Sequence, residues 1–142
     1  MDFRTLPEGP LCLTNLQTPA CLIGQPGDLT PIEIHIAGGK IVDHIAATVI
    51  DMGRAMVFPA FVDMHTHLDK GHIWARAPNP DGTFMGALDT VGADRRAHWT
   101  AGDVRARMDF ALRCAWAHGT GAIRTHLDAL APQDAISFGV FT

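Results

Sequence analysis

A His-x-His motif that closes an apolar run is the feature that most constrains how this chain can fold. Residues 56–62 are apolar, and His65 and His67 follow them after Asp63 and Met64. We expect one buried strand over residues 56–69, in which residues i and i+2 point to the same face. The two imidazoles then lie side by side, roughly 7 Å apart at the backbone, and Asp69 shares their face. Both rings can reach one ion at metal–nitrogen distances of about 2.0–2.1 Å, so the motif predicts half of a metal site.

The motif is weak by itself, because 8 of the 142 residues are histidines. A pair of histidines satisfied by ordinary hydrogen bonds is the alternative. The context favours a metal site, since an apolar strand precedes the pair, carboxylates flank it, and a glycine and a long irregular segment follow it. The pair would stand at the carboxyl end of a strand, where barrel enzymes keep their chemistry.

Composition excludes several classes of function. The formal charge of −4 offers no basic surface for nucleic acid, and we expect Arg105 and Arg107 on a solvated face. Apolar stretches are all shorter than the roughly 18 residues of a membrane span. Three widely spaced cysteines without a C-x-x-C motif favour reduced thiols, and the start of the chain has no apolar signal region. These features predict a cytoplasmic protein.

The first part of the chain reads as β-structure. Isoleucines at 32, 34 and 36 alternate with other residues, as in a half-buried strand, and Gly38-Gly39 can form a two-residue turn. Residues 40–45 would return as the second strand of a hairpin. We expect His35 and His44 on its surface and assign them no metal role, because neither has a ligand-type neighbour at short spacing.

A long irregular segment and then a helix follow the motif. Residues 70–99 contain many glycines and prolines, and we interpret them as a lid or pocket wall, with a simple surface excursion as the alternative. Residues 100–119 have the pattern of a helix, with Thr100 as N-cap and Asp103 as capping-box partner. Its predicted buried stripe consists of Val104, Met108, Ala111, Leu112 and Ala115.

A second short strand is predicted at residues 122–128. Arg124, His126 and Asp128 would share one of its faces. Strand, loop, helix and strand form a βαβ unit with parallel strands, so His126 and Asp128 should lie at the same sheet end as His65 and His67. A purely structural polar cluster is the alternative to a role in substrate binding.

These motifs together resemble the cytosine deaminase-like branch of the amidohydrolase superfamily. The order and separation of the motifs are similar to that branch across residues 56–130, and the hairpin resembles the small β-domain that precedes its barrel. The carrying segments are FPAFVDMHTHLDK at residues 58–70, NPDGTF at residues 79–84 and IRTHLD at residues 123–128.

The resemblance implies an α/β fold: the start of a (β/α)8 barrel, preceded by part of a small β-sandwich. Residues 1–55 would be the β-rich domain and residues 56–142 the first βαβ portion of the barrel. It further implies one divalent ion, zinc or iron, held by His65 and His67. Residues that would contact substrate or support the ligands are Asp69, Arg124, His126 and Asp128.

The implied reaction is the hydrolytic deamination of an amino-pyrimidine or related cyclic amidine by a metal-activated water. Cytosine, isocytosine, another amino-pyrimidine and a triazine all remain open as substrates. No catalytic residue beyond the ligands can be placed in this chain, and a barrel needs about 250 residues. We therefore expect the chain to be inactive alone, as the first part of a longer enzyme, for which a homo-oligomer is one open arrangement.

Two other hypotheses remain. The chain could be a non-catalytic module or remnant that pairs with a separate chain through an open sheet edge and an uncovered helix. It could also be a small metal protein of another fold that uses His65, His67, His126 and Asp128, since four ligands suit zinc.

Overall fold

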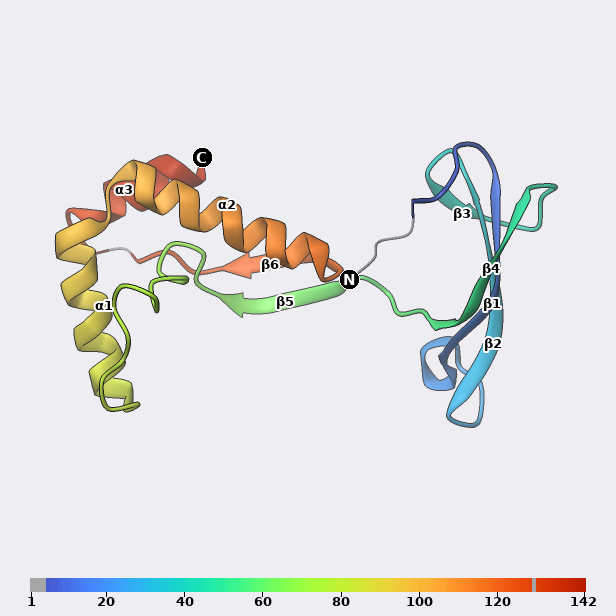
Figure 1. Ribbon diagram of the computed structural model, residues 1–142, viewed down its shortest axis with the longest axis horizontal. Coiled ribbons are helices and arrows are strands. Elements are labelled where there is room, and N and C mark those ends of the chain that lie inside the picture. The colour runs from blue at the N-terminus through green and yellow to red at the C-terminus, as the bar shows by residue number, and fades with distance from the viewer. Residues whose placement is uncertain (1–4, 129) are drawn as a thin grey trace. The chain divides into compact units, whose positions relative to one another are not determined.

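The computed structural model describes residues 5–128 and 130–142 and divides the chain into two compact units (Figure 1). Unit 1 comprises Met1–Pro59 and unit 2 comprises Ala60–Thr142. The fold is mixed α/β, with the β-rich part at the N-terminus. No helix in the described part of the chain is long and apolar enough to cross a membrane.

Unit 1 is built on a four-stranded sheet with the order β3-β2-β1-β4 (Figure 1). Strand β1 is antiparallel to β2 and parallel to β4. The predicted hairpin is confirmed as β2 and β3, and both Gly38 and Gly39 have positive φ, the conformation that a tight turn needs. The elements are β1 (Leu11–Pro19), a 3-10 helix η1 (Ala20–Ile23), β2 (Leu29–Ala37), β3 (Lys40–Val42) and β4 (Thr48–Met56).

The apolar run before the His-x-His motif is divided between the two units after Pro59. The expectation of one buried strand over residues 56–69 is wrong, because Met56 closes β4 and pairs with Gln17 of β1. The Val57 amide also donates to the Gln17 carbonyl at 2.8 Å. Pro59 has no N–H to continue the ladder, and a new strand begins two residues later. Unit 1 therefore ends after Pro59, whereas our proposed domain boundary follows residue 55.

Unit 2 contains the predicted βαβ unit, with an additional helix between its strands and another after the second strand. Strands β5 and β6 are parallel, with Phe61 opposite Thr120 and Thr66 opposite Thr125. Contrary to expectation, β5 is largely exposed, because described elements cover only part of its surface. The elements are β5 (Phe61–Thr66), α1 (Phe84–His98), α2 (Ala101–Ala117), β6 (Thr120–Thr125) and α3 (Gln133–Phe141).

Helix α1 replaces half of the irregular segment expected over residues 70–99. Thr83 caps it by accepting the Gly86 amide at 2.9 Å, and an N-cap threonine is a strong start signal. Gly86 and Gly92 lie inside this helix and weaken the sequence pattern, since glycine is a poor helix former. The expected irregular conformation is therefore wrong for the second half of the segment, and its role as a lid or pocket wall stays a prediction.

Helix α2 agrees closely with the prediction. The Thr100 hydroxyl accepts the Asp103 amide at 3.2 Å, which confirms the N-cap. The apolar stripe supplies the core of unit 2, although Leu112 is exposed rather than buried. The core cluster consists of Leu68, Trp99, Val104 and Met108, with Ala111 and others packed against it.

Arg76 joins the loop after β5 to both long helices. Its guanidinium donates to the two carboxylate oxygens of Asp94 at 2.8 Å each and to those of Asp103 at 2.5 and 3.0 Å. These hydrogen bonds hold the pKa of both carboxyl groups below the usual range. Asp94 also accepts the Trp99 indole N–H at 2.8 Å, so this network fixes the junction between α1 and α2.

We expect the stabilising effect of Arg76 to depend on pH. A carboxyl group with a lowered folded-state pKa contributes stability above its ordinary pKa of 3.8, and that contribution is lost as the pH falls further. Arg76→Gln should lower the urea midpoint of unit 2 at about pH 6, with the difference from wild type shrinking towards about pH 3. Tryptophan fluorescence reports unit 2 selectively, because the chain's tryptophans are Trp74, Trp99 and Trp116.

The matched control is Arg105→Gln, which removes an exposed arginine from α2. It should leave the urea midpoint nearly unchanged at every pH. A difference between Arg76→Gln and wild type that stays constant down to about pH 3 would contradict the assigned role of these carboxylates.

Candidate metal centre

His65 and His67 lie together at the carboxyl end of β5. His65 is the penultimate residue of the strand, and His67 follows its last residue. Their ring centroids are 5.3 Å apart, as expected for residues i and i+2 on one face of an extended segment. The structure therefore brings the two predicted ligands side by side.

A third imidazole joins them from β6. The His126 amide donates to the Thr66 carbonyl at 2.8 Å, which continues the pairing of the two strands by one residue. The His126 ring centroid then lies 4.6 Å from that of His65 and 5.5 Å from that of His67. Parallel pairing thus gathers three imidazoles from segments about 60 residues apart in the sequence.

Two carboxylates border the three rings. Asp69 is fully buried, and its Oδ2 accepts the Asp128 amide at 2.8 Å. His67, Asp69 and Asp128 each offer one ligand atom, and these atoms lie within 4.8 Å of one another. The Asp128 carboxylate also forms ion pairs of 3.2 Å with Lys70 and with Arg95. The ends of β5 and β6 are therefore tied together by side chains as well as by the ladder.

The electrostatics of the site suit a bound cation. Within the described part of the chain, His67 Nδ1 and Asp69 Oδ1 are buried and have no hydrogen-bond partner. Burial lowers the pKa of His67, and the positive charge of Lys70 lowers it further. The neutral imidazole with a free lone pair is the form that binds a metal. Imidazole nitrogens with carboxylate oxygens are donors that zinc and iron accept, so the residues present fit one side of such a centre.

Arg124 does not join this cluster. Its side chain is exposed, and among the described residues no hydrogen bond or ion pair connects it to the three histidines. A role for Arg124 in substrate binding stays a prediction.

Arg107 holds the segment that follows the histidines, a role that the sequence analysis did not predict. The expected solvated position is wrong, because Arg107 is only 6% exposed. Its guanidinium donates to the backbone carbonyls of Asp69 and Gly71 and lies 4.6 Å from the centre of the Trp99 ring. Its Nε donates to Asp103 at 2.9 Å, and this i, i+4 spacing on one helix was the available sequence signal.

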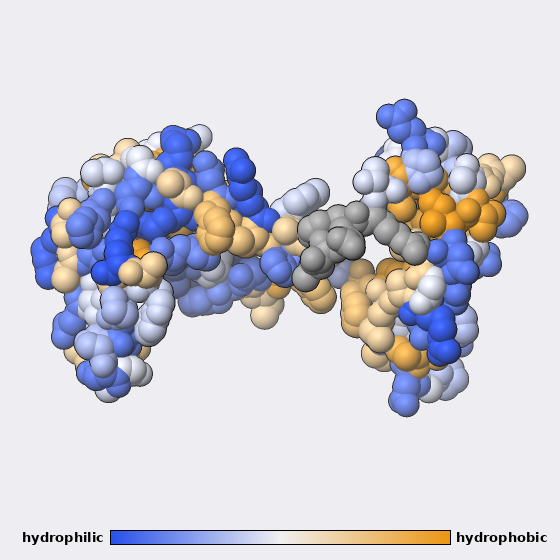
Figure 2. All heavy atoms as spheres, in the orientation of Figure 1, coloured by the Kyte–Doolittle hydropathy of each residue, from blue (hydrophilic) through white to orange (hydrophobic). Residues whose placement is uncertain are grey.

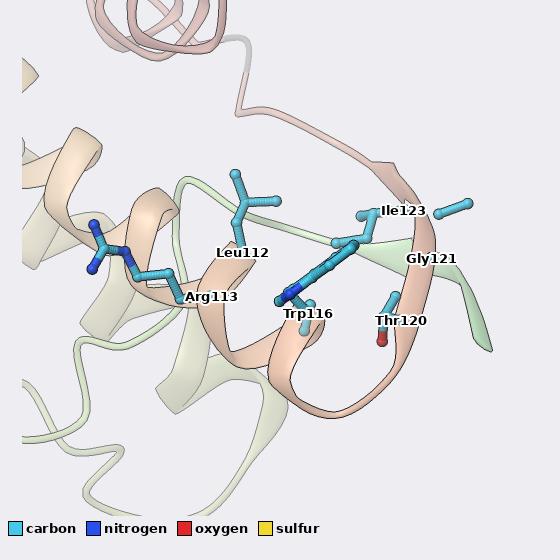
Figure 3. Close-up of a pocket in the computed structure, with 8 residues that line it drawn as sticks. Leu112, Arg113, Trp116, Thr120, Gly121 and Ile123 are labelled. Carbon is cyan, nitrogen blue, oxygen red and sulfur yellow. The ribbon is translucent and has the colours of Figure 1, made fainter. Parts of the chain in front are cut away.

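An apolar groove of unit 2 lies away from the histidines. It has a volume of about 500 Å³ and lies between the last turns of α2 and the start of β6 (Figure 3). Trp116 stands in the middle of the view, with Leu112 and Ile123 nearby. The histidine cluster is at the other end of β6, so this apolar groove is not part of the metal centre.

Comparison with known proteins agrees with the sequence resemblance. The chain is 54% identical to a protein named pterin deaminase from Rhizobium rhizogenes (strain K84), over 92% of this chain and 32% of that protein. The resemblance to amidohydrolase-superfamily deaminases is confirmed. The chain spans about a third of the length of this curated relative.

A solved structure shows the same fold. It is the 5-methylcytosine deaminase from Klebsiella pneumoniae liganded with 5-fluorocytosine, with a TM-score of 0.67 and 22% sequence identity. The match covers 92% of this chain and 32% of the deaminase chain. No protein-family profile matches the sequence. At this identity the structural match supports the mixed α/β fold with its β-rich N-terminal part.

Proposed function

We propose that this chain provides the metal-binding end of a hydrolytic deaminase. The observation that carries the proposal is the convergence of three imidazoles and two carboxylates at the carboxyl ends of two adjacent parallel strands. In this proposal β5 and β6 are the first two strands of a (β/α)8 barrel, within the unit Ala60–Thr142. The sheet formed by β1 to β4 belongs to a small β-sandwich. Barrel enzymes carry their active sites at this end of the strands.

His65 and His67 would hold one divalent ion, zinc or iron. Such an ion acts as a Lewis acid, and it makes water a better nucleophile at neutral pH. Burial lowers the pKa of His67, which favours the neutral ring whose lone pair can bind an ion. Asp69 accepts the Asp128 amide and so holds the two strand ends, and their histidines, at a fixed separation. His126 lies within ring contact of both ligands and would border the substrate.

The charged groups around Asp128 limit what this carboxylate can do. Lys70 pairs with its Oδ1 and Arg95 with its Oδ2, so both carboxylate oxygens already accept hydrogen bonds from cationic side chains. Asp128 therefore orders the rim of the site. The proton that reaches the departing ammonia is assigned to no described residue of this chain.

We propose that the substrate is a heterocycle with an amino-substituted pyrimidine ring. Hydrolysis replaces the amino group by a carbonyl, consumes one water and releases one ammonia. A pterin contains such a ring fused to a second one, and the 54% identity to a protein named pterin deaminase favours a pterin over cytosine. Both compounds belong to the amino-pyrimidine class that the sequence motifs suggest.

A chimera tests this function directly. Residues 1–142 would replace the matching third of the Rhizobium rhizogenes pterin deaminase, and ammonia release would be measured with pterin and with cytosine. We expect the chimera to deaminate pterin, because this chain supplies the two proposed ligands in an equivalent fold. The unfused 142-residue chain should release no ammonia from either compound.

Two results would contradict the proposal. One is a soluble, folded chimera without activity when the parent enzyme is active in the same assay. The other is steady turnover by the unfused chain, which would show that residues 1–142 form a complete site of another kind.

A non-catalytic module that docks on a partner chain is the second candidate. The exposure of large apolar side chains on β5 and α2 favours it, with Met64 at 74% and Trp116 at 80%, and Figure 2 shows hydrophobic residues at the surface of both units. Such patches mark interaction surfaces. A monodisperse monomer that unfolds cooperatively in sedimentation and denaturation experiments would count against this candidate.

A further inference from the structure

Unit 1 holds a second group of metal-binding side chains, separate from the histidine cluster of unit 2. Cys12 of β1 lies directly opposite His35 of β2 in the antiparallel ladder, and Glu33 precedes His35 by two residues. Opposed residues, and residues two apart on one strand, point to the same face of a sheet. One ligand atom from each of the three side chains lies within 4.8 Å of the others.

The spacing of these atoms suits a coordinated ion. Cys12 Sγ is 3.7 Å from His35 Nε2. With Zn–S and Zn–N bonds of about 2.3 and 2.1 Å, a sulfur and a nitrogen on one tetrahedral zinc lie about 3.6 Å apart. Cys12 and His35 are 6% and 8% exposed, so the expected surface position of His35 is wrong, whereas Glu33 is exposed. The group therefore combines a buried thiol and a buried imidazole with a carboxylate that faces solvent. An ion could enter from that solvent side.

His35 carries a buried atom that its protein neighbours leave unsatisfied. Its Nε2 contacts both Cys12 and, at 3.2 Å, His44 Nδ1. Its Nδ1 is buried and has no hydrogen-bond partner among the described residues. Whichever nitrogen carries the hydrogen, the ring keeps one unpaired buried polar atom, which is unfavourable. Cys12 and His44 also share the single Nε2 atom, which can form an ordinary hydrogen bond with only one of them at a time.

We propose that Cys12, Glu33 and His35 form a binding site for a divalent transition-metal ion. Thiolate, imidazole and carboxylate donors together match Zn²⁺, which accepts all three. His44, just beyond the end of β3, contacts the same His35 Nε2 at 3.2 Å, and an ion bound at this nitrogen would replace that contact. The ion would join β1 to β2, and binding would release the Cys12 thiol proton.

Cobalt titration of the metal-free 142-residue chain tests the site. Co²⁺ bound to a thiolate gives a charge-transfer band in the near ultraviolet, which bound histidines and carboxylates do not give. The candidate centre of unit 2 contains no cysteine among its donors, so the band reports the site in unit 1. We expect a band that saturates at one equivalent and disappears when Zn²⁺ is added in competition.

Variants then assign the ligands. Cys12→Ser should abolish the band, while Cys21→Ser and Cys114→Ser should retain it. Glu33→Gln changes an exposed side chain and leaves the buried part of the sheet intact. It should weaken Co²⁺ binding by about tenfold or more, since even residues outside the ligand shell contribute 10–100-fold.

Three results would overturn the proposal: no band with the wild-type chain, a band that survives Cys12→Ser, or wild-type affinity in Glu33→Gln. Far-ultraviolet circular dichroism checks the fold of each variant. If Cys12→Ser does not fold, the affinity of Glu33→Gln decides the matter, because that substitution lies on the surface.

Discussion

Replacing His67 with alanine in the pterin deaminase chimera should reduce ammonia release from pterin by about 10²–10³-fold. Loss of a ligand weakens the metal site, and the Lewis-acid contribution of the ion to the transition state is worth several kcal/mol. His67 is the right histidine to test, because its Nδ1 is buried without a partner and its neutral form is favoured. The assay is the initial rate at saturating pterin, with metal content measured on the same samples.

The control for this experiment is His98→Ala, which removes an exposed histidine near the end of α1. It should keep both the rate and the metal content of the chimera. Full activity and full metal content in the His67→Ala chimera would remove His67 from the proposed ligand set. Loss of activity with unchanged metal content would instead assign His67 to substrate contact.

Replacing Arg107 with alanine should destabilise unit 2 by about 3 kcal/mol or more. The change leaves the backbone carbonyls of Asp69 and Gly71 without their buried donor, and it leaves Asp103 without one of its two arginines. Removing one partner from such a buried charged network typically costs about 3–5 kcal/mol. The contact between the guanidinium and the Trp99 ring is lost as well.

Urea unfolding followed by tryptophan fluorescence measures this effect in unit 2. Arg113→Ala, an exposed arginine on the same helix, is the control and should change the stability by less than about 0.5 kcal/mol. Arg107→Lys should fall between the two, because lysine keeps the charge but loses the planar fork of donors. Equal stabilities of Arg107→Ala and wild type would show that the segment after β5 is held in some other way.

Elements with a clear local pattern were predictable from the sequence. Thr100 as a cap and the apolar spacing of Val104 and Met108 are both local signals, and they predicted α2 to within two residues at its C-terminal end. The sequence pattern did not predict helix α1, because Gly86 and Gly92 lower helix propensity. The N-cap residue Thr83 was the local signal that indicated a helix. The run at residues 56–62 was misread because hydrophobicity alone does not show that Pro59 interrupts the pairing.

The candidate metal centre was predictable in part, because a general rule of strand connection places its two strands side by side. Placing His126 near His65 required only the rule that strands of a βαβ unit are parallel. The buried position of Arg107 depends on backbone carbonyls 36 and 38 residues away, and the contact of Cys12 with His35 spans 23 residues. Such contacts arise from strand register and tertiary packing, so the local sequence around each residue does not predict them.

The small core of unit 2 also determines how its unfolding responds to heat and denaturant. Only four described residues form its buried cluster, while several large apolar side chains on β5 and α2 stay in water. The heat-capacity change and the denaturant m-value both grow with the apolar surface that unfolding newly exposes. The 142-residue chain should therefore melt over a broad temperature range. Fusion to the rest of a deaminase should sharpen that transition, because a larger cooperative unit that buries the same side chains has a larger unfolding enthalpy.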